Sequence, residues 1–311
     1  MNGCQSACEF AHQSLKCEPP RKQRAVTQMR KNTIWSSKVS HVGEISVRRP
    51  LPIAKAQSIG PFVLFDHFGP VPAPSRELGA HPHSGIEVMT YLIEGANEHT
   101  DSLGNVGQIE SGGAQWMRAG RGILHAERNL LDRATTMHGL QIWAKLPIEE
   151  QDSAPQYSAF QSEEMVELQS KGIKIRLLAG ELEALSGPMK LASPALMAHV
   201  QINAGATFEF TFPEAAHEYA FYVIQAGEPI ELDNSARSAH GDMIRFEAGA
   251  QKALLSNSSN DLAQIFILGG EPILTSLHFS GGFVLDSEAS IETAYTRYRT
   301  GEMGRLDGVP F

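Results

Sequence analysis

Short apolar segments alternate with turn residues along most of the chain. Beginning near Glu163, five such segments follow one another at fairly even spacing, separated by Gly, Pro or Asn: IKIRLLAGEL, LMAHVQINAGATFEFTF, YAFYVIQAGEPIEL, GDMIRFEAGAQKALLSN and LAQIFILGGEPI. Residues 34–47 and 58–70 also suit strands, and the second of these segments ends in a predicted turn over residues 66–70. Many short strands of this kind are typical of an all-β sandwich or barrel.

The two halves of the chain resemble each other. YLIEGANEHTDSLGN in the first half is similar to YVIQAGEPIELDNSA in the second, and GGAQWMRAGRGILH is similar to GDMIRFEAGAQKALL. We therefore predict an all-β fold of two tandem jelly-roll β-barrels. In the second copy, His217 has no histidine two residues away, and Leu254 and Leu255 stand where His125 would map. We expect the second barrel to be structural.

Residue composition and the spacing of apolar residues suggest where these units begin and end. We expect residues 1–32 to be a disordered leader, 33–150 the first barrel, 151–286 the second barrel, and 287–311 a helix and tail. Residues 147–160 hold two prolines with acidic and small side chains, which favours a linker. Asp286 or Ser287 can cap the helix and Gly301 can end it. Its apolar stripe is predicted to be Ile291, Ala294, Tyr295 and Tyr298.

Charge and cysteine distribution separate the leader from the body. The chain of 311 residues has a formal net charge of −9. Six Lys/Arg against Glu9 and Glu18 give the first 32 residues +4, so the remainder carries −13. An acidic body argues against direct nucleic-acid binding. The three cysteines all lie in the leader, at a spacing that matches no standard metal site. A body without cysteine fits a reducing, cytoplasmic compartment, and no apolar run approaches the ~18 residues of a membrane helix.

Two pairs of side chains indicate a metal site. His81 and His83 are two residues apart, so both leave the same face of a strand, and His125 and Glu127 repeat this spacing. Turn residues between the two pairs break the chain into short antiparallel strands. If those strands lie side by side, three imidazoles and one carboxylate meet at one point. Such a nitrogen and oxygen set is typical of a mononuclear metal centre.

Four further residues are candidates for supporting this site or lining its pocket. Glu87 shares the strand parity of His81 and His83. His67 could be a fifth ligand or support one, although a role in tying its turn to a neighbouring loop is the favoured interpretation. Trp116 and Met117 could line an aromatic pocket, although such residues in strands belong to the core more often.

In these and other stretches the chain resembles the pirins, which are two-barrel members of the cupin superfamily. The matching stretches include GPFVLFDHFGP, HPHSGIEVMTYLIEG, HTDSLGNVGQI, QWMRAGRGILHAE and HGLQIW. The resemblance implies that His81, His83, His125 and Glu127 hold the metal. In many other cupins the residue corresponding to Glu87 is a ligand, whereas in pirins it is not. The chain departs from the family at Gly113-Ala114, at Arg118 and in LHFSGGF, changes that affect the shape of the pocket.

The resemblance also implies a function. One divalent ion per chain is expected, Fe(II) before Cu, Ni, Co or Zn. Pirin-like proteins of bacteria are associated with quercetin 2,3-dioxygenase activity, which cleaves a small aromatic flavonol with O2. Glu127 is the catalytic candidate, as the base that accepts the proton of the flavonol hydroxyl.

Two alternatives remain open from the sequence. Pirins in animals are iron-dependent transcriptional co-regulators, so the metal could instead be a redox switch acting through a protein partner. A purely stabilising metal is the third alternative, although structural sites tend to be closed. We expect the protein to be a monomer.

Overall fold

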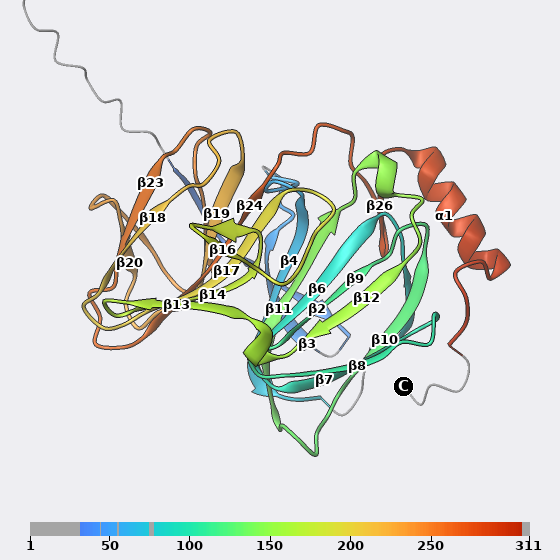
Figure 1. Cartoon of the computed structure of the whole chain (residues 1–311), viewed down its shortest axis with the longest axis horizontal. Coiled ribbons are helices and arrows are strands. Elements are labelled where there is room, and N and C mark those ends of the chain that lie inside the picture. Colours follow the sequence, from blue (N-terminus) through green and yellow to red (C-terminus); the bar gives the residue numbers. More distant parts are fainter. Residues whose placement is uncertain (1–31, 44, 55, 75–77, 307–311) are drawn as a thin grey trace, which may run out of the picture. The chain divides into compact units, whose positions relative to one another are not determined.

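The computed structural model describes residues 32–306, with the exception of residues 44, 55 and 75–77. The predicted leader and its cysteines lie almost entirely outside the described residues. Strands dominate the remainder, one α-helix follows them near the C-terminus, and the prediction of tandem cupin-like domains is confirmed (Figure 1). The sheets do not close into complete barrels. Each half is instead a large sheet facing a small one, consistent with a jelly roll.

The first half contains a seven-stranded and a four-stranded sheet. The seven-stranded sheet runs in the order β12 (Gln156–Phe160), β9 (Ala114–Arg118), β6 (Ile86–Glu94), β11 (Thr136–Lys145), β4 (Phe62–Pro72), β3 (Ile45–Leu51) and β2 (Lys38–Val42). The four-stranded sheet runs in the order β5 (Leu78–His83), β10 (Ile123–Asn129), β7 (Ala96–Asp101) and β8 (Val106–Glu110).

The second half repeats this arrangement. Its seven-stranded sheet runs in the order β1 (Thr33–Ser36), β22 (Asp242–Arg245), β19 (Glu218–Gln225), β24 (Ala263–Gly270), β17 (Ala195–Ile202), β14 (Ile173–Ala179) and β13 (Val166–Ser170). Its four-stranded sheet runs in the order β18 (Thr207–Thr211), β23 (Lys252–Ser256), β20 (Ile230–Leu232) and β21 (Ala236–Ser238).

Short elements complete the described chain. They are the hairpins β15 (Glu181–Leu182) with β16 (Leu185–Ser186) and β25 (His278–Ser280) with β26 (Phe283–Leu285), the 3-10 turns η1 (Ile148–Glu150) and η2 (Ser162–Glu164), and the helix α1 (Glu288–Thr300).

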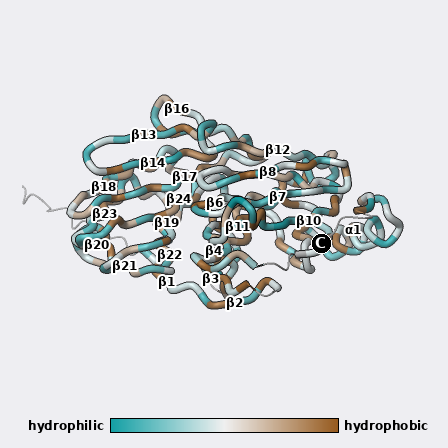
Figure 2. Tube along the Cα trace, turned by 90° about the horizontal axis from the view of Figure 1, so that it is seen from below, coloured by the Kyte–Doolittle hydropathy of each residue, from teal (hydrophilic) through white to brown (hydrophobic). Residues whose placement is uncertain are grey.

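The two seven-stranded sheets share one apolar core between the halves. Phe65 on β4 meets Tyr222 on β19 and Phe266 on β24, with ring centroids 4.8 and 5.9 Å apart. Figure 2 shows hydrophobic segments concentrated in these central strands. Because each of these large sheets is covered on both faces, its central strands are buried over most of their length without alternation, and every residue of β24 is buried.

The interior of the second half is filled with side chains. Phe210, Phe212, Phe221 and Phe246 pack together there at ring separations of 4.6–6.0 Å, and Leu255 is fully buried in the same cluster. Within the described residues, no group of histidine, cysteine or acidic side chains with metal-ligand spacing lies in this half. That the second barrel has a purely structural role stays a prediction.

Two local predictions are wrong. The turn expected over residues 66–70 is absent, because β4 runs unbroken from Phe62 to Pro72 and pairs with β11 on one side and β3 on the other. The linker expected over residues 147–160 contains η1 and then β12, whose backbone pairs with β9. The sheets also exchange strands across the expected limits, since β1 joins the large sheet of the second half.

The C-terminal helix begins and ends as its residues predict. The Ser287 side chain accepts a hydrogen bond from the Ser290 amide, and Gly301 takes the left-handed conformation that closes the helix. Ile291 and Ala294 are buried against β25 and β26, whereas Tyr298 is 40% exposed and does not belong to the buried stripe.

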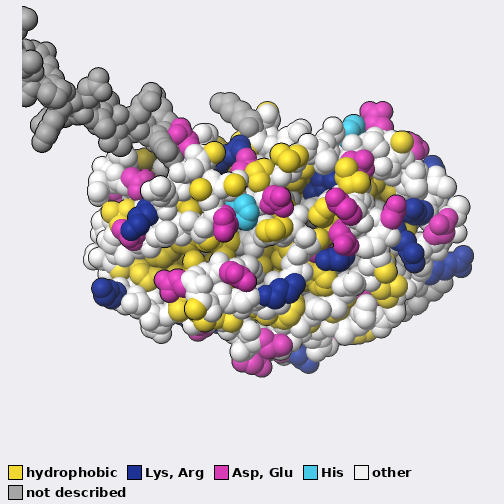
Figure 3. Space-filling model, turned by 45° about the horizontal axis from the view of Figure 1, so that its top comes forward, with side chains coloured by type: hydrophobic (Ala, Val, Ile, Leu, Met, Phe, Trp, Pro, Cys, Tyr) yellow, Lys and Arg dark blue, Asp and Glu magenta, His cyan; other side chains and the backbone are white. Residues whose placement is uncertain are grey.

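Charged side chains of both signs lie on the surface. On the face shown in Figure 3, acidic and basic side chains are interspersed rather than gathered into a basic patch. Within the described residues, no helix is long and apolar enough to cross a membrane.

The core between the large sheets predicts a stability difference. We expect Phe266→Ala to lower the free energy of unfolding by about 3–5 kcal/mol, because Phe266 is fully buried and its loss leaves a cavity. Leu274→Ala is the control, since Leu274 is 93% exposed and should change stability by less than about 0.5 kcal/mol. Urea titration followed by circular dichroism measures both, and equal midpoints would contradict the role of this core.

Candidate metal centre

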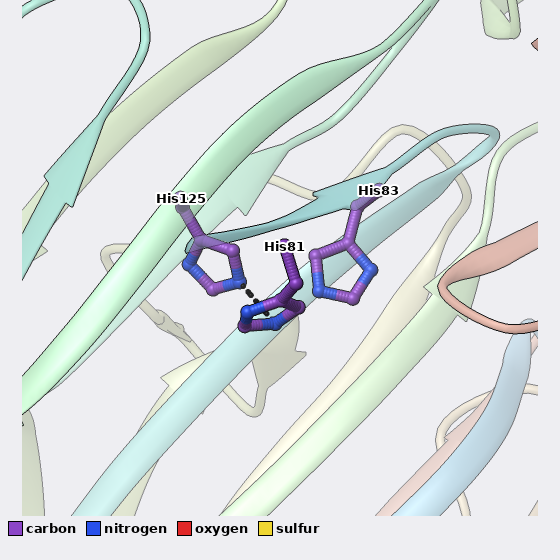
Figure 4. A group of neighbouring side chains, drawn as sticks. All are labelled: His81, His83 and His125. Atoms are coloured by element: carbon purple, nitrogen blue, oxygen red, sulfur yellow. Dashed lines mark hydrogen bonds between the residues drawn. The ribbon is translucent and has the colours of Figure 1, made fainter. Parts of the chain in front are cut away.

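Three histidines meet on two neighbouring strands. His81 and His83 lie on β5, and His125 lies on β10 directly opposite His81 in the antiparallel register. Their ligand nitrogens lie within 4.8 Å of one another (Figure 4). The predicted convergence of these imidazoles is therefore present in the structure.

Hydrogen bonds define which nitrogen each ring presents. Nδ1 of His81 lies 2.8 Å from the Gly79 carbonyl oxygen, and Nδ1 of His83 lies 2.9 Å from that of Gly282. Because a carbonyl only accepts, both Nδ1 atoms carry the proton, and Nε2 is left with its lone pair. Gly282 belongs to the hairpin between β25 and β26, about 200 residues further along the chain.

A relay of side chains fixes His125 in the same way. Its Nδ1 lies 3.4 Å from Nδ1 of His99, whose Nε2 lies 3.2 Å from a carboxylate oxygen of Asp101. A carboxylate can only accept a hydrogen bond, so a His99 ring that carries a single proton carries it on Nε2. His125 then donates from Nδ1 and presents Nε2 as a lone pair. Tyr157 stacks on the His99 ring at 4.0 Å and holds it in place.

Burial favours the uncharged form of two of the three imidazoles. Burial lowers the pKa of His83 to about 3, with a smaller contribution from the neighbouring His81, and burial likewise holds the pKa of His125 well below its ordinary value. Nε2 of His81 and Nε2 of His125 are 3.0 Å apart. Two facing lone pairs repel at that distance, so the contact needs either a proton on one of the two atoms or a metal ion between them. The donor set therefore fits a divalent metal ion, without defining which one.

Glu127 lies near the triad but does not belong to the group of converging ligand atoms. The register between β10 and β5 shifts between His125 and Glu127, so that Glu127 lies opposite Leu78 and not Gly79. Oε1 of Glu127 accepts hydrogen bonds from Gln115, from Thr90 at 3.3 Å and from Asn97 at 3.2 Å. Ligation by Glu127 therefore stays a prediction, while the carboxylate lines the same cavity as the triad.

The triad opens into a cavity of about 610 Å³. Polar groups border the cavity near Glu127, namely Thr90, Asn97 and Gln141. An ion pair between Arg49 and Asp66 lies on its wall, with two hydrogen bonds of 2.5 and 2.6 Å. The rest of the lining is mainly apolar: Val42, Ile45, Val47, Pro52, Leu64, Phe68, Leu92, Met137, Trp143 and Phe279. Its size and lining suit a small aromatic molecule.

Glu87 does not support the triad. The chain passes from the small sheet to the large one at Ser84-Gly85, which ends the shared parity with His81 and His83. Its buried carboxylate accepts hydrogen bonds from the Ala192 amide at 3.0 and 3.1 Å and from the Trp116 indole at 3.1 Å. Burial raises the pKa of Glu87, and these donors and Arg118 oppose that rise. Glu87 thus connects the two halves of the chain.

The other three pocket candidates also lie elsewhere. Trp116 packs in the core between the large sheets, and Met117 packs on the opposite face with Val88, so neither lines the cavity. His67 is buried between the halves, where Nδ1 lies 2.9 Å from Tyr222 Oη and Nε2 lies 2.9 Å from His138 Nε2. It is not a ligand of the triad, and the favoured interpretation of a connecting role is closer to the structure.

Sequence reasoning missed three supporting residues. His99 and Asp101 are two apart on β7, directly beside β10, so their spacing is the same signal that identified the triad. Gly282 carries no such signal, because only the folded chain brings its carbonyl to His83.

Comparison with known proteins agrees with this fold and site. The profile of the Pirin family matches residues 44–144, and that of the Pirin C-terminal cupin domain matches residues 197–304. The chain is 30% identical to Pirin-1 of Arabidopsis thaliana over 264 residues, which cover 83% of this chain and 88% of that protein. It is 31% identical over 272 residues to a Pseudomonas aeruginosa protein provisionally named quercetin 2,3-dioxygenase, covering 86% and 84%.

A solved structure supports the same conclusion about the fold. The crystal structure of a quercetin 2,3-dioxygenase from Acinetobacter baumannii superimposes with a TM-score of 0.82 at 23% identity, covering 90% of this chain and 93% of that one. Fold and histidine triad together define a tandem cupin protein with one candidate metal centre among its described residues. The chain belongs to the pirin family.

The triad predicts the loss of metal binding in a single variant. We expect His83→Ala to weaken binding of Fe(II) or Ni(II) by at least roughly 100-fold, because it removes one of three converging nitrogens. His217→Ala in the second half should bind like the wild type. Titration calorimetry on metal-free protein and elemental analysis check this, and unchanged binding by His83→Ala would remove the triad from consideration.

The buried His67 predicts a dependence of stability on pH. Burial, then the neighbouring His138, lowers its folded pKa to about 3 from the ordinary 6.5. Below about pH 6.5, His67 is protonated in the unfolded chain but stays neutral in the folded chain. The free energy of unfolding therefore falls from pH 6.5 toward pH 3. His67→Gln should flatten part of this fall in urea titrations of metal-free protein, whereas His41→Gln, at an exposed position, should leave the slope unchanged. Identical slopes would contradict the burial argument.

Proposed function

We propose that the protein is a metal-dependent dioxygenase that cleaves a flavonol or a similar cyclic enol with O2, as quercetin 2,3-dioxygenases do. The observation that carries the proposal is the direction of three Nε2 lone pairs toward an apolar cavity of about 610 Å³. The names of the Pseudomonas and Acinetobacter proteins support the same reaction class. Fe(II) is the first metal to test, with Cu, Ni and Co as alternatives.

The residues of the cavity have separable roles in this reaction. A bound metal ion would supply a Lewis acid that acidifies the enol hydroxyl and a centre for electron transfer to O2. Glu127 has three donors on Oε1 that orient the carboxylate, and within the described residues Oε2 has no hydrogen-bond partner. Oε2 is therefore the atom we assign to accept the proton of the substrate hydroxyl.

The cavity wall provides binding and exclusion of water. Phe68, Leu92 and Trp143 offer flat or apolar surface to the rings of the substrate. In the overall reaction both oxygen atoms of O2 enter the organic product, and the two ring carbon–carbon bonds of the carbon bearing the hydroxyl break. That carbon leaves with its own oxygen as carbon monoxide, and the hydroxyl proton is returned to the carboxylate of the product. Atoms balance with no further reductant.

The test is turnover of quercetin by protein loaded separately with Fe(II), Cu(II), Ni(II) or Co(II). We expect loss of flavonol absorbance together with carbon monoxide release for at least one metal. Glu127→Gln should keep the metal and lower kcat by roughly 10²–10⁴-fold, the usual contribution of a general base. His217→Ala is the matched control and should retain activity.

Two outcomes would contradict the proposal. If no metal gives carbon monoxide release, flavonol cleavage is ruled out as the activity, and the regulatory alternative is favoured. Full activity in Glu127→Gln would remove Glu127 from the role of base while leaving the reaction class in place.

A further inference from the structure

A second cavity, of about 200 Å³, lies where the two halves meet and is separate from the metal centre. Its walls come from β6 of the first half, from η2, and from β14 and β17 of the second half. Its polar lining consists of Tyr91, Ser111, Ser162, Lys174, Arg176, His199 and Gln201. No residue of this cavity takes part in the proposed reaction.

The chemistry of this lining is dominated by hydrogen-bond donors. Lys174 and Arg176 are cations, and no acidic side chain lines the cavity within the described residues. Ser162 Oγ accepts a hydrogen bond from Arg176 at 2.9 Å, so its own proton is available to a ligand. The Gln201 amide lines the same space and can add a further donor.

His199 forms part of the wall of the cavity without facing its interior through Nε2. The residue is 4% exposed, and Nδ1 lies 2.9 Å from the Tyr91 hydroxyl. Nε2 is buried and lies toward the side chain of Gln264, which does not line the cavity. The donors available to a ligand are therefore those of Lys174, Ser162 and Gln201.

Glu167 limits the affinity of this cavity for an anion. It lies outside the lining and pairs with Lys174 at 2.9 Å and with Arg176 at 2.5 Å. Two cations and one carboxylate leave a net local charge of +1. Lys174 has two further ammonium protons to offer, so the site suits a small anion held with modest affinity.

We propose that this junction is a binding site for a small oxyanion, a phosphate or a short dicarboxylate, that joins the two halves of the chain. Lys174, Ser162 and Gln201 donate to its oxygens, and Arg176 organises the wall through its bonds to Ser162 and to the Gly112 carbonyl. The ligand contacts both halves, so its binding stabilises the folded chain as a whole.

The experiment is a thermal unfolding titration of metal-free protein, so that anions cannot act through the metal centre. Inorganic phosphate and succinate are added in separate arms, each against sodium chloride of equal ionic strength. We expect at least one anion to raise Tm by roughly 2–4 °C at about tenfold above its Kd. A response to phosphate alone, to succinate alone or to both identifies the source of the oxyanion.

Matched variants locate the effect. Lys174→Met should abolish the rise in Tm. Lys252→Met should keep it, because Lys252 forms the same kind of pair, with Glu209, on another sheet of the same half. Ser162→Ala is a second, milder variant that should reduce the rise. Hydrogen exchange should show protection of residues 162–176 when the anion is present.

Two results would overturn the proposal. One is a rise in Tm with phosphate and with succinate that is no larger than the rise with sodium chloride of equal ionic strength. The other is an equal rise in Lys174→Met and Lys252→Met, which would place the anion elsewhere. Neither result bears on flavonol cleavage, which is measured at the other cavity.

Discussion

The packing of two seven-stranded sheets against each other determines what every central strand can do. β4, β6 and β11 each turn one set of side chains toward the second half and the alternate set toward the cavity of the first. Along β6, Glu87 and Tyr91 bond to the other half, whereas Thr90 and Leu92 line the cavity. One strand therefore serves both the junction and the site, and its sequence is constrained on both faces.

Neighbouring groups orient the three histidines of the candidate metal centre. Two backbone carbonyls and the pair His99–Asp101 define the proton on each imidazole, and the same strands carry the residues that orient Glu127. The second half has the same layered form but fills its interior with aromatic side chains. The two halves thus use one architecture for two purposes, a lined cavity in one and a solid core in the other.

Strand spacing predicted the parts of the site that lie within single strands. His81, His83 and His125 follow from residues two apart on strands that pair directly, and His99 with Asp101 carried the same signal. Glu87 lies away from the triad because parity does not survive the passage from one sheet to another at Gly85. Trp116 lies in the core, which was the favoured interpretation, since a large residue in a strand belongs to the core more often than to a pocket. The strand β12 looked like a linker because an edge strand needs little hydrophobicity when its backbone pairs with β9.

The hydrogen bond from His83 to Gly282 makes the candidate centre depend on a distant part of the chain. The carbonyl that orients the His83 ring belongs to the hairpin of β25 and β26, about 200 residues further along. A chain shortened before this hairpin would keep all three histidines but would lose the acceptor that orients one of them. The hairpin is in this sense a part of the site, although it contributes no ligand atom to it.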